Sequence, residues 1–510
     1  RRLRPVVELD DEEYARLFCR CAWYVLAGAL AFAVVFALLA WLRFRQFYGG
    51  RFDLGNMVQA VYNTAHGRFL EITTAGPEPR QMSRLGAHVD PVLAAFALPW
   101  LVWPSPVMLL TLQALIVSTA AWPAYCLGSR VTRDPRAGAL LAGALLLYPA
   151  LGYGVLNEFH AVTLATPLLL FAFLYLDEAR WLRALPFLVL AALCKEEVPL
   201  VLAAMGAYFA LRTRSWRPFV LSAIALMYFV VAVWVVIPHF NEGPNPFVDR
   251  YVAYGDSAAD VARGVLTSPR QVAADLTAAG NLEYWAELLW PLAFAPVLSP
   301  LTLLVAAPEF LLNGLSTQIW QRSIQFHYTA AEIPFVFAAA VLGLMRFWRW
   351  LGGGFRTSDA EMRGERVERR DLALVVLLAA LAGSYVLGPL PFGLPGARYG
   401  SATFARSAHA KVLEEAVAVV PEGVPVSVNN NVGSHLSARR VVYVFPEYEG
   451  ADYVVVDETR PGYYDRINEQ LHQAALGRLV LDQRYQSVYA RDDVVVFRRV
   501  DAGAPPPASP

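Results

Sequence analysis

Charged residues are scarce in this chain. Asp, Glu, Lys and Arg make up 17% of its 510 residues and hydrophobic residues 56%, whereas soluble domains contain about 25% charged residues. This scarcity excludes an ordinary soluble domain and predicts an integral membrane protein. The formal net charge of zero excludes the basic footprint of a nucleic-acid-binding protein, so no nucleic-acid partner is expected.

Cysteine and lysine are rarer still. The chain has four cysteines, all in or beside apolar runs, and this excludes a disulfide framework. Of its 43 basic residues only Lys195 and Lys411 are lysine. Lys195 stands inside an apolar stretch, where a charge near mid-bilayer costs roughly 2.5–3.5 kcal/mol. It is therefore a candidate functional residue.

Long hydrophobic runs are what the chain has in abundance. About 20 apolar residues span a bilayer, with roughly 17 as the lower limit. Two stretches, 184–211 and 285–315, are interrupted by Lys195-Glu196-Glu197 and by Ser299-Pro300. The clear spans are 21–42, 106–129, 137–155, 161–176, 217–238, 331–346 and 371–390. The sequence thus predicts a mainly α, polytopic transmembrane fold.

The arginines decide whether the two interrupted stretches are single helices or hairpins. Short loops rich in Arg stay in the cytoplasm. All four such loops lie on one side only if 184–211 and 285–315 are helical hairpins, which predicts about 11 spans with a cytoplasmic N-terminus. The first outer loop is then 43–105, and its segment 91–103 is predicted as a helix lying in the membrane interface. The four Arg-rich loops are 130–136, 180–183, 212–217 and 346–370.

The composition changes after the membrane domain, which we predict to cover residues 1–390. A run of strands alternating with helical segments predicts a small extracytoplasmic α/β domain over 391–500. No Gly-rich phosphate motif follows any of the strands, so nucleotide binding there is unsupported. Residues 501–510, rich in Pro and Ala, are expected to be a disordered tail. The predicted elements are a helix at 404–420 and strands at 424–428, 440–444, 452–456, 479–481 and 494–498.

Ten polar side chains gather at helix ends on the predicted outer side. Ionisable residues within membrane segments indicate functional sites, because their insertion is costly. Five outer connections supply them, so they converge on one face. They are Asp53, His88, Asp90, Glu158, His160, Lys195, Glu196, Glu197, His327 and Tyr328.

Most of these residues have both a chemical and a structural interpretation. Asp53 is a candidate catalytic base or metal ligand, but Asp is also a favoured helix N-cap. Glu158 and His160 are candidate ligands, with Asp53, of a divalent cation such as Mg²⁺ or Mn²⁺; the alternative is that they are exposed loop groups. Lys195 either binds a phosphate as a point charge or forms an ion pair with the two following glutamates that stabilises a bent hairpin.

The remaining candidates are predicted to bind substrate, and they too have structural alternatives. His88 and Asp90 suit a polar group at the start of a helix. His327 and Tyr328 suit an anchor at the membrane interface, where Tyr is enriched.

Several motifs together resemble a family of bacterial polytopic membrane proteins that is described only as a domain of unknown function. That family is similar to the GT-C glycosyltransferase superfamily. The resemblance covers roughly residues 45–345, with a weaker match at 429–446. The matching stretches are 52–55, 63–67, 88–91, 103–106, 148–149, 157–160, 195–197, 327–328 and Pro334.

The GT-C resemblance implies a specific fold and activity. Such enzymes have many spans, a large first outer loop and a soluble C-terminal domain outside the cytoplasm. They transfer sugar from a polyprenyl-phosphate donor to an extracytoplasmic glycan, lipid or protein. Asp53 matches their early acidic residue and Lys195 matches a phosphate-binding position. Glu158 matches the first of two paired acids, but His160 replaces the second, a departure that bears on metal dependence.

Three functions are therefore open. The first is a glycosyltransferase of the bacterial cytoplasmic membrane with Asp53 as base or metal ligand. The second is a transporter or flippase of a lipid-linked or anionic solute, although such proteins usually contain internal repeats and none is evident. The third is a non-catalytic membrane scaffold, because a fold does not fix a function.

Overall fold

The longest helix of the protein is α1 (Asp11–Arg45). The computed structural model describes residues 10–351, 368–394, 399–467 and 469–501, so the predicted tail lies outside the described residues except for Asp501. The α1 helix begins at Asp10, whose side chain accepts a hydrogen bond from the Glu13 backbone N–H at 2.7 Å, as favoured N-caps do. Large apolar side chains along α1, such as Leu30, are exposed. A lipid environment suits that surface.

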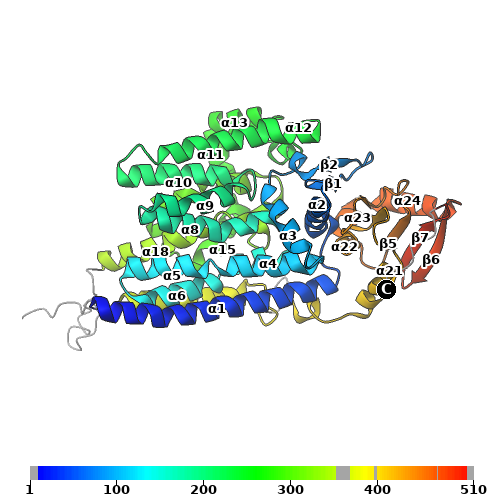
Figure 1. The fold of residues 1–510 in the computed structure, drawn as a ribbon. Coiled ribbons are helices and arrows are strands. Elements are labelled where there is room, and N and C mark those ends of the chain that lie inside the picture. The colour runs from blue at the N-terminus through cyan, green and yellow to red at the C-terminus, as the bar shows by residue number, and fades with distance from the viewer. Residues whose placement is uncertain (1–9, 352–367, 395–398, 468, 502–510) are drawn as a thin grey trace, which may run out of the picture.

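Apolar helices lie side by side with α1 and form the body of the molecule (Figure 1). Several begin at a proline, which is well accommodated at the first helical position. The main helices are α4 (Pro106–Ser118), α5 (Ala121–Thr132), α6 (Pro135–Leu146), α7 (Pro149–Leu156), α8 (Ala165–Asp177), α9 (Trp181–Ala192), α10 (Val198–Thr213), α11 (Phe219–Val231), α18 (Ile333–Trp350) and α20 (Arg369–Val386).

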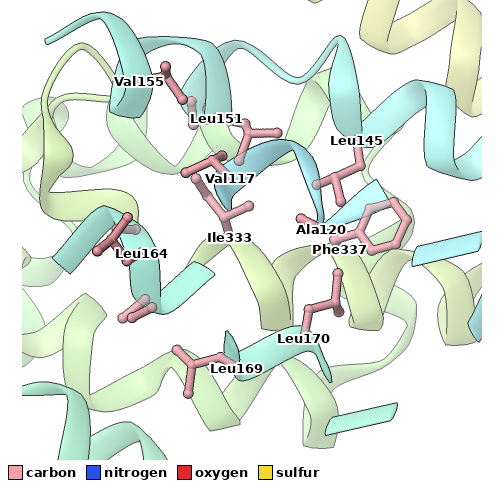
Figure 2. Packing of buried hydrophobic residues seen from close by; sticks show 14 of the residues in the cluster. Val117, Ala120, Leu145, Leu151, Val155, Leu164, Leu169, Leu170, Ile333 and Phe337 are labelled. Carbon is pink, nitrogen blue, oxygen red and sulfur yellow. The ribbon is translucent and has the colours of Figure 1, made fainter. Parts of the chain in front are cut away.

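The core of this bundle is built around α18. Phe337 and Ile333 of this helix are fully buried and pack among side chains of α4, α6 and α7, including Val117, Leu145 and Leu151 (Figure 2). Helix α18 is buried nearly all round along its first three turns, as expected of a helix that is hydrophobic on all faces. Helix α18 therefore lies at the centre of the bundle, and the shorter helices pack around it.

Four described helical segments are long and apolar enough to cross a membrane, or five if the α6–α7 pair, bent by 46°, is one span. Several other predicted spans coincide with apolar helices of 10–17 residues, so helix length alone does not establish a count of eleven. The four segments are 11–45, 106–132, 219–241 and 333–350.

Both interrupted stretches contain a break, as predicted. Helices α9 and α10 are separate and joined by residues 193–197. The second stretch contains α15 (Ala279–Leu289), short turns and α17 (Ala307–Leu315). The segment predicted to lie in the interface forms η3 (Pro91–Phe96) and α3 (Ala97–Trp100). Helix α12 (Ile237–Asn241) ends the segment that corresponds to span 217–238. Two helices that follow it were not predicted: α13 (Ala258–Thr267) and α14 (Pro269–Leu276).

The C-terminal region contains a five-stranded sheet of order β4-β3-β5-β7-β6. The central strand β3 pairs in parallel with β4 and β5, whereas β5 pairs with β7, and β7 with β6, in antiparallel register. The helices α21 (Ala408–Ala418) and α24 (Glu469–Leu481) accompany the sheet. The strands are β3 (Val426–Val428), β4 (Val442–Val444), β5 (Tyr453–Asp457), β6 (Tyr485–Arg491) and β7 (Val494–Arg499).

The strand predicted at 479–481 is wrong, because these residues are the last turn of α24. The buried residues of this helix, His472, Ala475 and Leu479, follow the helical spacing of one face. That longer pattern outweighs the short apolar run. The prediction also missed β6, whose side chains are mostly exposed.

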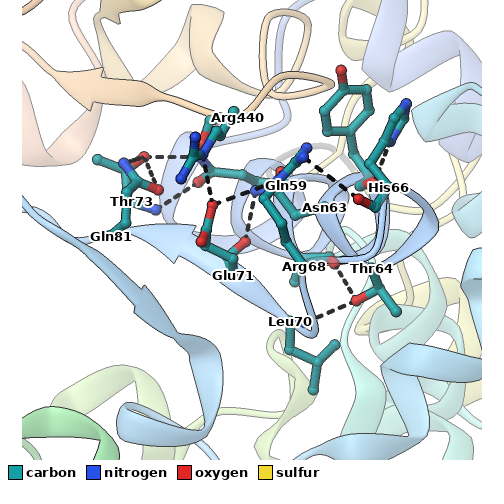
Figure 3. A network of polar contacts seen from close by, with 12 residues as sticks. Gln59, Asn63, Thr64, His66, Arg68, Leu70, Glu71, Thr73, Gln81 and Arg440 are labelled. Atoms are coloured by element: carbon teal, nitrogen blue, oxygen red, sulfur yellow. Dashed lines mark hydrogen bonds and ion pairs between the residues drawn. The ribbon is translucent and has the colours of Figure 1, made fainter.

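A polar network joins residues 43–105, the loop predicted to be the first outer one, to the C-terminal sheet (Figure 3). The loop forms α2 (Asn56–Ala65) and a hairpin of β1 (Glu71–Thr73) and β2 (Gln81–Ser83). Gln59, fully buried, donates hydrogen bonds to the Thr73 hydroxyl at 2.8 Å and to the Arg440 carbonyl at 2.7 Å. The two regions are thus fastened together by contacts between residues about 380 positions apart.

Candidate functional site

A cavity of about 250 Å³ lies where the connections that carry the candidate residues meet. Seven of the ten candidate residues line it: Asp53, His88, Asp90, His160, Lys195, His327 and Tyr328. Glu158, Glu196 and Glu197 do not line the cavity, and each holds a neighbouring group instead. The convergence that the topology predicted is therefore observed for most of the set.

Asp53 is the most accessible carboxylate of the cavity. It lies in η1 (Arg51–Gly55), one π-helical turn that leads into α2, and such turns recur at functional sites. Its side chain is 50% exposed, and its Oδ1 lies 3.3 Å from Nε2 of His160, which is 5% exposed. Burial opposes ionisation of Asp53, but the adjacent His160 imidazole and the Arg84 guanidinium outweigh it and lower the pKa of this carboxyl. Asp53 is thus ionised at neutral pH.

Two buried imidazoles lie behind Asp53. The rings of His160 and His327 stack with centroids 3.6 Å apart and planes at 19°. Nδ1 of both rings has no hydrogen-bond partner among the described residues. Burial, and then the nearby His160, lower the pKa of His327, so His327 is neutral at pH 7.

Glu158 organises the backbone around Asp53. Its Oε2 accepts hydrogen bonds from the backbone N–H groups of Gly50 at 3.0 Å and Leu54 at 2.9 Å. The residue has a φ of +67°, a strained conformation for a non-glycine residue and one that clusters at functional sites. Burial and the charge of Asp53 raise the pKa of Glu158.

These contacts do not fit the predicted three-residue metal site. The Glu158 carboxylate points to backbone donors, which leaves only Asp53 and His160 as a close pair. Among the described residues, no three His, Cys, Asp or Glu side chains are grouped to hold a metal ion. No step below is therefore assigned to a metal.

Lys195 lies in the turn between α9 and α10, as the broken apolar stretch predicts. Its Nζ is 2.6 Å from Oε1 of Glu197 and lies 5.5 Å from the centre of the Tyr328 ring. Burial opposes its charge, but Glu197 and Glu196 outweigh that effect and raise the pKa of the ammonium group. Lys195 is charged, and an adjacent carboxylate compensates that charge.

Glu196 fixes the orientation of His88. One carboxylate oxygen lies 2.8 Å from His88 Nδ1, and the other accepts a hydrogen bond from the Val89 backbone N–H at 2.9 Å. The His88 ring in turn stacks on Phe247, with centroids 4.4 Å apart. Glu196 thus acts as a support from behind the cavity wall.

Arg84 and Asp90 form a buried ion pair on the cavity wall. Nη2 of Arg84 is 2.8 Å from Oδ2 of Asp90, and the two side chains are 4% and 2% exposed. Burial raises the pKa of Asp90 to about 6, although Arg84 opposes the shift. Because the Asp90 carboxylate is paired with Arg84, its role is to hold Arg84 in the cavity wall rather than to contact a substrate.

Removing the carboxylate of this pair is expected to destabilise the protein strongly. Asp90→Ala leaves the Arg84 charge buried and unpaired, which costs about 3–5 kcal/mol. Thermal unfolding of the purified protein would show a lowered midpoint, and the double variant Asp90→Ala with Arg84→Met should recover part of the loss. Equal midpoints for the single variant and the wild type would contradict this expectation. They would show that water already solvates the charge of Arg84.

The Asp53 segment is held from the other side by the C-terminal domain. Asn430 Oδ1, from α22 (Asn430–Gly433), accepts a hydrogen bond from the Phe52 backbone N–H at 3.1 Å. The fully buried Arg51 donates to the Val442 carbonyl at 3.2 Å and to Gln59 at 2.8 Å. The α/β domain therefore contributes directly to the position of Asp53.

Several residues that line the cavity were not among the ten candidates, and the most informative of them are Phe247 and Arg250. They follow the span 217–238 in a polar stretch with no membrane signal. Arg84 also lines the cavity and was not one of the ten candidates. The local signal that points to Arg250 is a charged residue beside an aromatic one in the loop that follows a span.

The bundle of apolar helices, with a polar cavity at the end contacted by an α/β domain, defines a polytopic membrane protein with a polar site. The chain belongs to the family described as Predicted membrane protein (DUF2079), whose model matches residues 43–496. A search of curated proteins finds no match to the chain. The family match confirms the predicted membrane-protein family, and its description names no activity.

Proposed function

We propose that this protein is a GT-C-type glycosyltransferase that transfers a sugar from a polyprenyl-phosphate donor to an extracytoplasmic glycan, lipid or protein. One observation carries the proposal: a single cavity is lined by the half-exposed carboxylate of Asp53 and by three cationic side chains, Lys195, Arg84 and Arg250. Displacing a phosphate from a sugar needs a proton acceptor for the attacking hydroxyl and positive charge near the departing phosphate. The cavity provides both.

The proposed reaction is a displacement at the anomeric carbon of the donor sugar. The acceptor hydroxyl oxygen forms a bond to that carbon while the bond from the carbon to the phosphate oxygen breaks. Asp53 accepts the hydroxyl proton, and the bonding electron pair leaves with the polyprenyl phosphate. His160, 3.3 Å from Asp53, stabilises the carboxylate before the reaction.

The proposed orientation places the cavity outside the cytoplasm of a bacterial cell. Arg130 and Arg212 both form ion pairs with Asp177 at the last residue of α8. His160 precedes the start of the same helix, whose 13 residues correspond to about 20 Å. If the Arg-rich end is cytoplasmic, the cavity and the C-terminal domain face outward from the cytoplasmic membrane.

The proposal is tested first on the lipids that the protein holds. The full chain, purified in mild detergent, is extracted and analysed by mass spectrometry. We expect polyprenyl phosphate or a polyprenyl-phosphate sugar among the extracted lipids, and the sugar identifies the donor. That donor, labelled in its sugar, is then incubated with the reconstituted protein and an envelope extract from a deletion strain.

A labelled, covalently glycosylated product supports the proposal. Movement of the labelled lipid across the liposome bilayer without such a product would instead identify a transporter. Only bulk phospholipid in the extract, together with an unchanged envelope glycan in the deletion strain, would contradict both activities and favour a scaffold.

A further inference from the structure

The three cations that line the cavity differ in how far their charge is already compensated. Lys195 has Glu197 at 2.6 Å and Arg84 has Asp90 at 2.8 Å. Both pairs are at most 15% exposed, so neither charge is screened strongly by water. An anion that approached Lys195 or Arg84 would compete with a carboxylate already in place.

Arg250 has no such partner. Among the described residues no carboxylate lies within ion-pair distance of its guanidinium group, although Arg250 is half-buried. Its guanidinium carbon lies 4.4 Å from the centre of the Phe247 ring, a cation–π contact. A cation–π contact attracts the cation without neutralising it, so the charge and the donors of Arg250 are available to a ligand.

The structure also fixes Arg250 at the cavity. Phe247 stacks on His88, with ring centroids 4.4 Å apart and planes at 9°. The Arg250 carbonyl accepts a hydrogen bond from the Thr317 backbone N–H at 2.8 Å. The backbone of Arg250 is thus held by the turn after α17, and its guanidinium group lies against Phe247, which stacks on His88. A held arginine loses less entropy when it binds a planar oxyanion.

We propose that Arg250 is the principal residue that binds the phosphate group of the substrate, and that Lys195 plays a smaller part because Glu197 already occupies it. The proposal rests on the proposed function for the choice of a phosphate ligand. A guanidinium group presents paired donors that match phosphate oxygens, which an ammonium group does not. In the sequence analysis Lys195 was the candidate for the phosphate, with an ion pair to the following glutamates as the alternative. This assignment favours Arg250 instead.

The test measures binding separately from sugar transfer. Undecaprenyl phosphate in detergent micelles and inorganic phosphate are titrated into the full-length protein, with intrinsic fluorescence as the readout. Arg250→Gln is expected to weaken undecaprenyl phosphate binding on the order of 10- to 100-fold, and Arg250→Lys by less because the charge remains. Arg263→Gln, an exposed arginine of α13, removes the same charge away from the cavity and should leave binding unchanged.

A fourth variant compares the two cations. The double change Lys195→Gln with Glu197→Gln removes no net charge and should weaken binding less than Arg250→Gln does. Competition by inorganic phosphate at the same site, lost in Arg250→Gln, would show that a free anion is recognised as well as a lipid phosphate. Failure of phosphate to compete would assign the site to the lipid-linked form.

The proposal is overturned if Arg250→Gln binds undecaprenyl phosphate as tightly as the wild type, or if the wild type binds neither probe. It survives if Arg250-dependent binding is found but no sugar is transferred, and in that case only the proposed function fails. Thermal unfolding of each variant separates loss of binding from loss of fold, and Arg250→Lys provides the answer if Arg250→Gln is unstable.

Discussion

Replacing Asp53 with Asn is expected to lower the rate of sugar transfer by about 10²- to 10⁴-fold, the usual contribution of a general base. Asp53 is half-exposed to the cavity, whereas the other lining carboxylate, Asp90, is buried against Arg84. Asn keeps the size of the side chain but cannot accept a proton at neutral pH. The rate should therefore fall while the fold and the bound lipid are retained.

Asp249→Asn is the matched control for this experiment. Asp249 is exposed and lies next to Arg250 in the sequence, so the same chemical change is made close to the site but outside the cavity wall. Transfer rates, the thermal midpoint and the extracted lipids are compared for both variants. A normal rate for Asp53→Asn would remove Asp53 from the mechanism and make His160 the next residue to test.

The sequence predicted the parts of the fold that depend on local patterns. The break at Lys195-Glu196-Glu197 predicted two helices, α9 and α10, because three charged residues end an apolar run. The strands β3, β4, β5 and β7 were found because β-branched residues cluster there. The exposed strand β6 was missed. The last turn of α24 was predicted as a strand, because a short window does not distinguish an amphipathic helix from a strand.

The sequence predicted which residues meet at the candidate site, but it did not predict what each side chain does there. A topology that places five connections on one face brings Asp53, His160 and Lys195 together, as observed. The sequence offered an ion pair between Lys195 and the following glutamates as one alternative, and the Lys195–Glu197 contact agrees with it. Local sequence could not decide between that ion pair and a phosphate, and it did not show that Glu158 accepts hydrogen bonds from backbone donors. Such contacts depend on side-chain directions that only the packed fold determines.

The contact between the Asp53 segment and the C-terminal domain is the largest feature that the sequence did not reveal. Its partners are nearly 400 residues apart, and no periodic pattern links them. Small residues make the close approach possible. A Cβ atom added at Gly433 would lie 3.0 Å from the Arg51 Cα atom and closer still to its Cβ atom, so the backbone of α22 is in contact with the segment that bears Asp53.

Gly433→Ala is therefore expected to reduce sugar transfer by about 10²-fold, the effect of displacing a catalytic group by about 1 Å. The added methyl group pushes against Arg51, two residues from Asp53, whereas Lys195 and Arg250 lie on other elements. Binding of undecaprenyl phosphate should remain close to that of the wild type. A loss of transfer with retained binding would distinguish misplacement of Asp53 from general unfolding.

Gly477→Ala in α24 is the matched control, because nothing lies within 4 Å of its added Cβ atom. In a helix this change adds up to about 1 kcal/mol of stability, so its transfer rate should equal that of the wild type. Equal rates for the two alanine variants would show that α22 does not position Asp53. A specific loss in Gly433→Ala would mean that the α/β domain completes the site. A membrane domain without it would lack α22, which contacts the segment that bears Asp53.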